Sequence, residues 1–320
     1  MQQLLRFSTD ALPERDRFAI WREVFGRYVV TAQLEPIGDG GCSQTATLRE
    51  LPGLSLGSFS STAYQGIRSR NLVADGNDNL LLVINVAGQS QFRQLGREAA
   101  VASCEGVLMA SAEHGSGIFP TASRQLTINV PRQIIVPVVR DPEAIACRPL
   151  PRSEVLRLLI SYIQSADSLS LDSPGLAQAF ATHVHDLMAL AIGATSDGEE
   201  VARGRGLRAA RLAAIKLDIG RFLGRNDLSI GALALRHGVT PRYIQKLFES
   251  EGATFTEYVI ERRLLEAKRM LTDPQFADQN IGDIALKAGF GDLPHFTRSF
   301  RRRFGMTPSD VREQARRDPQ

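Results

Sequence analysis

The sequence has little cysteine, and its three cysteines lie far apart. Cys42, Cys104 and Cys147 form no Cys-x-x-Cys pair, and any disulfide would leave one thiol over. This argues against a disulfide-stabilised domain or a zinc site and favours buried, reduced thiols. The sequence also lacks a run of 18 or more apolar residues, and residues 1–6 lack the apolar core of a secretion signal. We therefore expect a cytoplasmic protein without a membrane span.

Histidine is scarce as well, which restricts the enzymes that this chain could be. His114 is the one histidine among the short β runs, and His183 and His185 are two positions apart on a predicted helix, so they point in different directions. A metal site needs histidine and carboxylate ligands that converge, and these residues do not provide one. The sequence shows no glycine-rich phosphate loop and no nucleophile elbow. We predict a protein that is not an enzyme and that carries no cofactor or metal.

What the chain does contain is a motif repeated within residues 230–311. Residues 230–239 read IGALALRHGV and residues 281–290 read IGDIALKAGF, and a second helix pattern follows each of them. Both copies have an alanine where two helices must approach closely. Four residues later comes a glycine, Gly238 or Gly289, which suits a left-handed turn. This pattern is typical of a helix-turn-helix, and its repetition predicts two such units.

The second helix of each copy has an apolar face and a polar face. In a helix-turn-helix this second helix enters the major groove, so its polar face is expected to contact DNA. Arg298 and Gln245 are the residue types that read base edges, whereas cations and hydroxyls such as Lys246 anchor phosphates. The alternative is that these are ordinary solvated helix faces. The predicted contact residues are Thr240, Arg242, Gln245 and Lys246 in the first copy, and His295, Thr297, Arg298 and Arg302 in the second; of these, Thr240, Lys246 and Arg302 are expected at phosphates.

Residues 254–271, between the two copies, read as one long helix that starts near Thr256 and Glu257. Roughly 16–18 residues at 1.5 Å each give a rigid spacer of about 25 Å. Two recognition helices held by it could enter major-groove segments about one turn, ~34 Å, apart on one side of the duplex.

The charge of the chain is divided between its halves. Residues 205–320 hold 21 Lys and Arg against 14 Asp and Glu, whereas residues 1–204 hold 17 against 21. All the lysines lie in the second half. The second half is therefore the electrostatic match for a polyanion such as DNA, and the first half is not.

The first half is rich in short β runs. Residues 45–139 alternate or form brief apolar runs, and Gly, Asn and Asp punctuate them. This predicts a β-sandwich or small barrel, which can hold one small ligand. Before it, residues 13–25 form an amphipathic helix in which Trp21, the sole tryptophan, is expected to anchor the core.

Two further helices are expected before the repeat. Ser153 caps the first and Ser173-Pro174 starts the second. Their apolar stripes either cover the β core or form a dimer interface, and the sequence leaves both open. Residues 193–206 are polar, glycine-rich and aperiodic, which predicts a flexible linker.

Together these motifs carry a family resemblance. Residues from about 210 to 317 resemble the DNA-binding domain of AraC/XylS-type bacterial transcription regulators. One departure is Pro294, because relatives usually have a polar residue near the start of the last recognition helix; proline is tolerated there but removes a possible base contact. The matching stretches are Arg263-Leu264, Ala267-Lys268, Leu271, Ile281-Gly282-Asp283-Ile284-Ala285, Ala288-Gly289-Phe290, His295-Phe296-Thr297-Arg298-Ser299-Phe300 and Phe304-Gly305-Met306-Thr307-Pro308.

The first half shows a looser resemblance. Gly88, Gln94-Leu95-Gly96-Arg97-Glu98 and Gly106-Val107-Leu108-Met109 are similar to the cupin-like N-terminal domain of one branch of that family. The resemblance implies a domain that senses a small organic effector or mediates self-association.

We therefore predict an α+β multidomain protein. Its N-terminal domain, 1–192, is a cupin-like β-sandwich or barrel (β part about 30–145) with a flanking helical hairpin (about 152–192). The flexible linker 193–206 follows, and then an all-α domain, 207–320, with two helix-turn-helix units joined by a long helix.

The function predicted from the resemblance is that of a sequence-specific, promoter-binding transcription regulator. We expect an activator controlled by a small organic effector, a homodimer, and RNA polymerase as a partner, while repression stays open. The alternatives are a metal-dependent cupin-type enzyme fused to a DNA-binding domain, and an architectural DNA binder without an effector. The effector, its pocket residues and the operator sequence do not follow from the sequence, because the strand register is not known.

Overall fold

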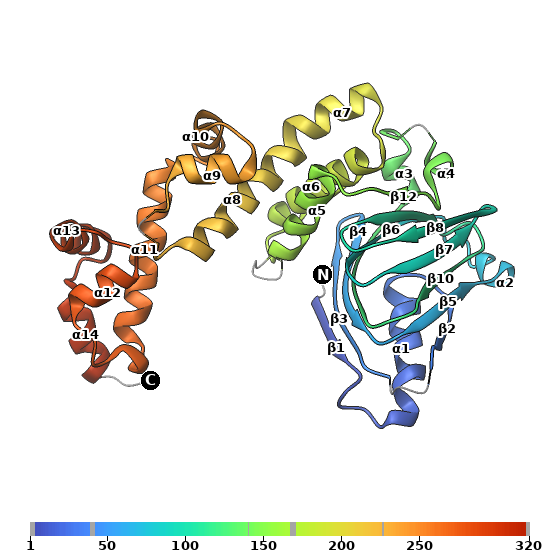
Figure 1. Cartoon of the computed structure of the whole chain (residues 1–320), viewed down its shortest axis with the longest axis horizontal. Helices are drawn as coiled ribbons and strands as arrows, with labels where there is room; N and C mark the ends of the chain where they lie inside the picture. The colour runs from blue at the N-terminus through green and yellow to red at the C-terminus, as the bar shows by residue number, and fades with distance from the viewer. Residues whose placement is uncertain (1–3, 39–41, 140, 167–170, 226, 318–320) are drawn as a thin grey trace. The chain divides into compact units, whose positions relative to one another are not determined.

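The computed structural model confirms the predicted fold class, with a β-rich first unit and a helical second unit (Figure 1). The two compact units are Met1–Arg211 and Leu212–Gln320, and each is described by itself. The structure describes residues 4–38, 42–139, 141–166, 171–225 and 227–317.

The first unit contains two antiparallel sheets. The larger sheet has, in spatial order, the strands β1 (Leu4–Ser8), β3 (Gln44–Leu51), β4 (Leu54–Ser61), β11 (Ser123–Val130), β6 (Leu80–Ala87), β9 (Gly106–Ala110) and β12 (Pro149–Leu150). The smaller sheet has the strands β2 (Gln33–Pro36), β5 (Tyr64–Arg68), β10 (Gly115–Phe119), β7 (Ser90–Gln94) and β8 (Arg97–Val101). Inward-facing residues of both sheets share one hydrophobic core, as expected of a sandwich.

The helix α1 (Glu14–Tyr28) contributes the centre of this core. Trp21 is fully buried, and its ring centroid lies 5.5 Å from that of Phe59, 5.8 Å from that of Phe25 and 6.1 Å from that of Phe7. The expected role of Trp21 as a core anchor is therefore confirmed. Three short helices, α2 (Arg70–Val73), α3 (Arg132–Ile135) and α4 (Pro142–Ile145), complete the β region.

A helical hairpin follows, formed by α5 (Glu154–Ser165) and α6 (Pro174–Ile192). Ser153 caps α5 by accepting a hydrogen bond from the Leu156 N–H, as the sequence suggested. Most residues of the two apolar stripes are buried within their own unit, where Tyr162 and Phe180 stack at 4.7 Å, whereas Leu176 at the start of α6 is 47% exposed. The stripes thus pack largely within the unit, and a role in a dimer interface stays a prediction.

The segment after α6 corrects one expectation. Residues 196–207 are helical, as α7 (Ser196–Ala202) and a π-helical turn η2 (Arg203–Leu207), and not an aperiodic flexible linker. Arg205 pairs with the buried Asp186 of α6 through two hydrogen bonds of 2.7 and 2.8 Å. A Cβ on Gly206 would lie 2.5 Å from the Asp186 Cβ. Gly206 allows the segment to approach α6 closely, and the ion pair of Arg205 with Asp186 links the two. Because these contacts use a glycine and an ion pair, the helix has no periodic apolar pattern in its sequence.

The second unit is entirely helical in its described residues and has two small cores. One core is formed within residues 212–259 and the other within residues 260–311. The long helix spans Phe255–Thr272, and a capping box formed by Thr254 and Glu257 starts it, two residues before the expected Thr256. The helices are α8 (Arg208–Phe222), α9 (Ile230–His237), α10 (Pro241–Glu249), α11 (Phe255–Thr272), η3 (Pro274–Phe276), α12 (Ile281–Lys287), α13 (Leu293–Phe304) and α14 (Pro308–Arg317).

Candidate nucleic-acid interface

The repeated motif forms two helix-turn-helix units, α9–α10 and α12–α13. The turn glycines have the predicted left-handed conformation, with φ +62° at Gly238 and +94° at Gly289. Side chains cap the first helix of each unit, because Ser229 accepts from the Ala232 N–H and Asn280 accepts from the Asp283 N–H. Each turn is therefore encoded locally.

Side chains also define where the second helices begin. The Thr240 hydroxyl oxygen accepts a hydrogen bond from the Tyr243 N–H at 3.2 Å, and an Asp292 oxygen accepts from the His295 N–H at 3.0 Å. Thr240 keeps its own hydroxyl proton for a further acceptor. Pro294 lies in the first turn of α13, where a missing backbone N–H costs little.

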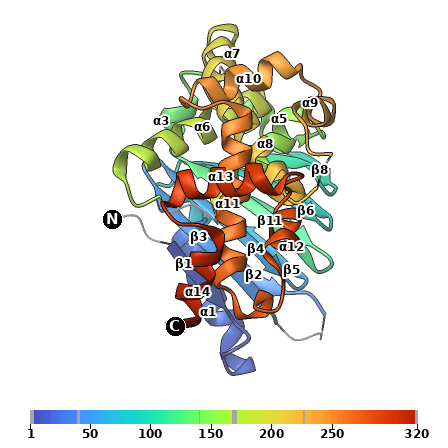
Figure 2. The same cartoon turned by 90° about the vertical axis from the view of Figure 1, so that its left-hand side faces the viewer.

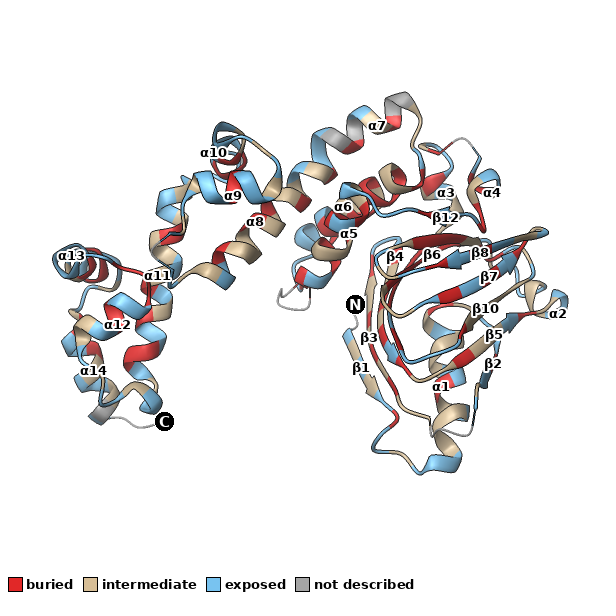
Figure 3. Ribbon diagram, viewed as in Figure 1, coloured by how far each residue is buried: buried red, intermediate tan, exposed pale blue. Residues whose placement is uncertain are grey.

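One face of each second helix is fixed by burial (Figure 3). Ile244, Leu247 and Phe248 of α10 are buried in the first core, and Phe296 and Phe300 of α13 are fully buried in the second. Full burial of a phenylalanine contributes about 1.5–3 kcal/mol. The rotation of each helix about its axis is therefore set by its apolar residues, which leaves the opposite face to solvent.

The solvent face of α10 carries three of the predicted contact residues. Arg242, Gln245 and Lys246 are all exposed, and their side chains have no hydrogen-bond or ion-pair partner within the described parts of the chain. Glu249 lies one turn beyond Gln245 and is exposed on the same helix. The face thus combines two cations, an amide and one carboxylate.

The solvent face of α13 carries the second predicted set. His295, Arg298 and Arg302 are exposed, and the two arginine side chains are without an ion-pair partner in the part of the chain that the structure describes. Thr297 lies at the edge of the buried face, and its hydroxyl donates to the Leu293 carbonyl oxygen at 3.0 Å. Its hydroxyl proton is thus used within the helix.

Three consecutive arginines at 301–303 have different surroundings, which the sequence did not reveal. Arg303 donates from Nε to both carboxylate oxygens of Glu261 at 2.8 Å, so it ties α13 to α11. Arg301 is exposed and lies three residues after Arg298, on the same side of the helix. It adds a cation to this face that the sequence analysis missed; the helical period of Arg298 could have indicated it.

The segment after α8 meets the turn of the second helix-turn-helix unit at a contact between backbones. A Cβ on Gly289 would lie 2.4 Å from the Leu223 carbonyl oxygen, and a Cβ on Gly224 would lie 2.5 Å from the Lys287 carbonyl oxygen. Arg263 of α11 closes this junction, because its Nε donates to Leu223 O at 3.1 Å and its Nη2 to Arg225 O at 3.2 Å. Burial lowers the pKa of Arg263, but its guanidinium group remains charged because arginine is not deprotonated in proteins.

The long helix α11 lies between the two helix-turn-helix units and packs against helices of both. Figure 1 shows α10 and α13 both close to end-on, with α11 running from one to the other, and Figure 2 shows α13 along its length. The long helix spans 18 residues, about 27 Å at 1.5 Å per residue. The unit therefore presents two similarly oriented helices with cationic solvent faces.

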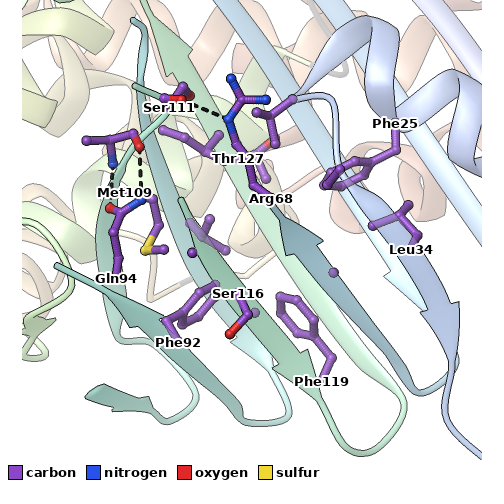
Figure 4. A pocket seen from close by; sticks show the side chains of 18 of the residues that line it. Phe25, Leu34, Arg68, Phe92, Gln94, Met109, Ser111, Ser116, Phe119 and Thr127 are labelled. Carbon is purple, nitrogen blue, oxygen red and sulfur yellow. Dashed lines mark hydrogen bonds between the residues drawn. The ribbon is translucent and has the colours of Figure 1, made fainter. Parts of the chain in front are cut away.

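A separate candidate site is a cavity between the sheets of the first unit (Figure 4). Its volume is about 90 Å³, and its wall is mostly apolar, with contributions from β2, β5, β6, β7, β10, β11 and α1. In Figure 4, Phe92 and Phe119 lie toward one end, and Arg68 and Gln94 lie toward the other. The sequence predicts a space for a small ligand in this unit but does not identify the residues that line it.

Within the described ranges, no group of three or more His, Cys, Asp or Glu side chains could hold a metal ion. The search for a helix long and apolar enough to cross a membrane, made over the same residues, finds none. Cys147 is buried and Cys104 is exposed, and burial raises the pKa of the Cys147 thiol.

Fold and site together define a class: a β-sandwich unit joined to a unit with two helix-turn-helix motifs whose second helices present cations, which is the design of a DNA-binding protein. Comparisons with known proteins agree. A helix-turn-helix domain family matches residues 233–314, and the AraC-binding-like domain family matches residues 21–193, more than half of the chain.

Named relatives match over most of the chain. It is 30% identical to the transcriptional activator RhrA of Rhizobium meliloti, covering 97% of each chain. It is 27% identical to the transcriptional activator NphR of a Rhodococcus species, covering 82% of this chain and 78% of that one. The crystal structure of the AraC-like transcriptional activator CuxR has the same fold, with a TM-score of 0.52 at 19% identity over 89% of this chain and all of that one. The chain therefore belongs to the AraC/XylS family of DNA-binding transcription regulators.

Proposed function

We propose that this protein is a cytoplasmic transcription activator that binds two adjacent major-groove segments of promoter DNA and responds to a small organic effector. The observation that carries the proposal is the pair of similarly oriented second helices, α10 and α13, whose solvent faces hold cations without partners in the described chain. Relatives named as transcriptional activators support the direction of control.

The predicted contact residues divide into two groups by chemistry. Arg298 and Gln245 are proposed at base edges, because their planar hydrogen-bonding groups can bind guanine or adenine in two places. Thr240, Lys246 and Arg302 are proposed at phosphates, and Arg242, His295 and Thr297 complete the surface. Thr240, at the N-terminus of α10, lies where backbone N–H groups also favour an anion.

The test is a salt-titrated gel shift of the full chain on the promoter regions of its own and neighbouring genes, with scrambled DNA as competitor. We expect a footprint over two adjacent major-groove turns that resists the competitor. Arg298→Ala should reduce discrimination between the site and a mutated site by ~1–3 kcal/mol. Lys246→Ala should weaken all sequences alike and lower the salt slope by about one.

Arg269→Ala is the matched control. It removes one positive charge from the same unit, but Arg269 already pairs with Glu266 on α11 and with Asp273, which follows that helix. It should therefore change neither discrimination nor footprint. Uniform loss of affinity in both Arg298→Ala and Lys246→Ala would show that the two roles are assigned wrongly.

Effector control and assembly need their own measurements. An effector should change operator affinity, whereas an architectural DNA binder would show no ligand-dependent change. RNA polymerase is proposed as the partner at the promoter, and a homodimer as the assembly. Sedimentation of the purified chain tests the dimer.

A further inference from the structure

The cavity of the first unit owes its shape to a row of residues that crosses four strands. Leu34 of β2 lies opposite Gly66 of β5, Gly66 lies opposite Gly117 of β10, and Gly117 lies opposite Phe92 of β7. Residues directly opposite one another point to the same face of a sheet. Leu34 and Phe92 line the cavity, so the two glycines between them face it as well.

The two glycines allow the flanking side chains to lie back against the sheet. A Cβ on Gly66 would be 3.0 Å from the Leu34 Cδ2, and a Cβ on Gly117 would be 2.9 Å from the Phe92 Cε1. Neither glycine has a positive φ, so backbone conformation does not require glycine at these positions. An added Cβ at Gly117 would require the Phe92 ring to shift, and one at Gly66 would require Leu34 to give by a few tenths of an ångström. In both variants the new methyl group would itself take space from the cavity that the two glycines face.

The arginine, amide and phenol groups of the wall already have hydrogen-bond partners. Arg68 donates to Ser111 O and Thr31 O at 2.8 Å and forms an ion pair with Asp75 at 2.7 Å. This ion pair also holds the pKa of the Asp75 carboxyl below its usual value. An anionic ligand would have to displace Asp75 from Arg68, and the Glu113 carboxylate nearby adds a further negative charge.

The amide and the phenol of the wall are satisfied in the same way. Gln94 donates to Ala110 O at 2.9 Å and accepts from the Ala110 N–H at 2.8 Å. Tyr64 donates to Gln125 Oε1 at 3.1 Å. What is left for a ligand is therefore mainly apolar contact, chiefly with Phe92, Phe119 and Leu34, besides the hydroxyl groups of Ser116 and Thr127.

From this geometry we infer that the cavity binds an uncharged, mainly apolar molecule of about one small ring, and that Gly66 and Gly117 set its size limit. An apolar cavity of about 150 Å³ holds benzene, and the present space of about 90 Å³ is smaller but not fully enclosed. The inference deepens the proposed function, on which it rests only for the effect of the ligand on DNA binding.

The experiment measures binding of toluene and of benzoate to the purified full-length protein, by calorimetry and ligand-observed NMR. The two probes share a ring and differ in a methyl group against a carboxylate. We expect toluene to bind at least tenfold more tightly than benzoate. Gly66→Ala and Gly117→Ala should each weaken toluene binding at least tenfold, because the added methyl group and the displaced Leu34 or Phe92 take up cavity space.

Ile118→Val is the matched control, since it changes the next residue of β10, whose side chain points to the opposite face. It should leave toluene binding unchanged. The fluorescence of Trp21 and operator binding without ligand check that each glycine variant is folded, and either variant alone suffices for the test.

Several results would overturn the inference: benzoate binding as tightly as toluene, toluene binding that ignores both glycine substitutions, or binding of neither probe. Operator affinity measured with and without probe separates this from the proposed function. Toluene that binds at the glycine row without changing operator affinity supports the ligand class but contradicts effector control. Benzoate that binds and changes operator affinity supports effector control but contradicts the ligand class.

Discussion

The two turn glycines occupy the same place in the repeat but have different neighbours, which allows a sharp prediction. In Gly238→Ala the new methyl group meets no atom within 4 Å. The cost is then that of an alanine in the left-handed region, about 1–2 kcal/mol, partly offset by about 0.4–1 kcal/mol because the unfolded chain loses freedom. We expect a net destabilisation of about 1 kcal/mol.

Gly289→Ala should cost much more. Its methyl group would lie 2.4 Å from Leu223 O and 2.6 Å from the Arg263 Nε, so the contact between the segment after α8 and the second helix-turn-helix unit must move. Overpacking adds about 1–3 kcal/mol, and loss of the Arg263 hydrogen bond to Leu223 adds up to about 1.5–3 kcal/mol. With the backbone strain, we expect about 3–5 kcal/mol in total.

Urea unfolding of the full chain measures both variants, with two probes. Circular dichroism at 222 nm follows the helices, whereas Trp21, the sole tryptophan, reports the first unit only. Gly289→Ala should shift the dichroism transition and leave the Trp21 transition in place. Equal destabilisation by the two substitutions, within about 0.5 kcal/mol, would refute the argument that close backbone approach at Gly289 decides the cost.

Two further predictions concern the helical part of the first unit. Arg205→Ala leaves the buried Asp186 carboxylate without its ion-pair partner, so it should lower the free energy of unfolding reported by Trp21 by about 1–2 kcal/mol. The loss is smaller than for a fully buried pair because Arg205 is half exposed. An unchanged urea midpoint would show that the ion pair does not hold η2. Burial lowers the pKa of His183 and of His185, so at acidic pH the folded state binds fewer protons than the unfolded state. The contribution of these histidines to stability is therefore complete above the usual histidine pKa of 6.5. It falls as the pH drops through and below that value. His183→Gln and His185→Asn should each flatten the fall in urea midpoint between pH 7 and 5.5, and a fall that persists in the double variant would assign it to other groups.

The helix-turn-helix units could be predicted from the sequence because their signals are local. A cap, a helical apolar period and a turn glycine lie within about twenty residues of one another, and the repetition made the pattern specific. The exposure of Arg242, Lys246 and Arg298 followed from the same period, because burying Phe248 and Phe296 fixes the opposite face. Whether these residues contact DNA is a prediction that stays open to the gel-shift test.

The linker and the arginine run show why the remainder could not be predicted. Within residues 196–207, Arg205 forms an ion pair with Asp186, nineteen residues earlier in the sequence. Arg301 and Arg303 are alike in sequence, and only the position of Glu261 on α11 makes one a structural ion pair. Contacts between distant segments leave no periodic trace in either segment.

The sequence alone determined the family, the order of the two units, the turns at Gly238 and Gly289, and the cationic faces of the second helices. Tertiary structure decided the rest. Only the strand register brings Gly66 and Gly117 into one row beside Phe92, and only helix packing brings Gly289 against Leu223. The physical reason is that helical faces arise from a period within one segment, whereas cavities and junctions arise where segments distant in sequence meet.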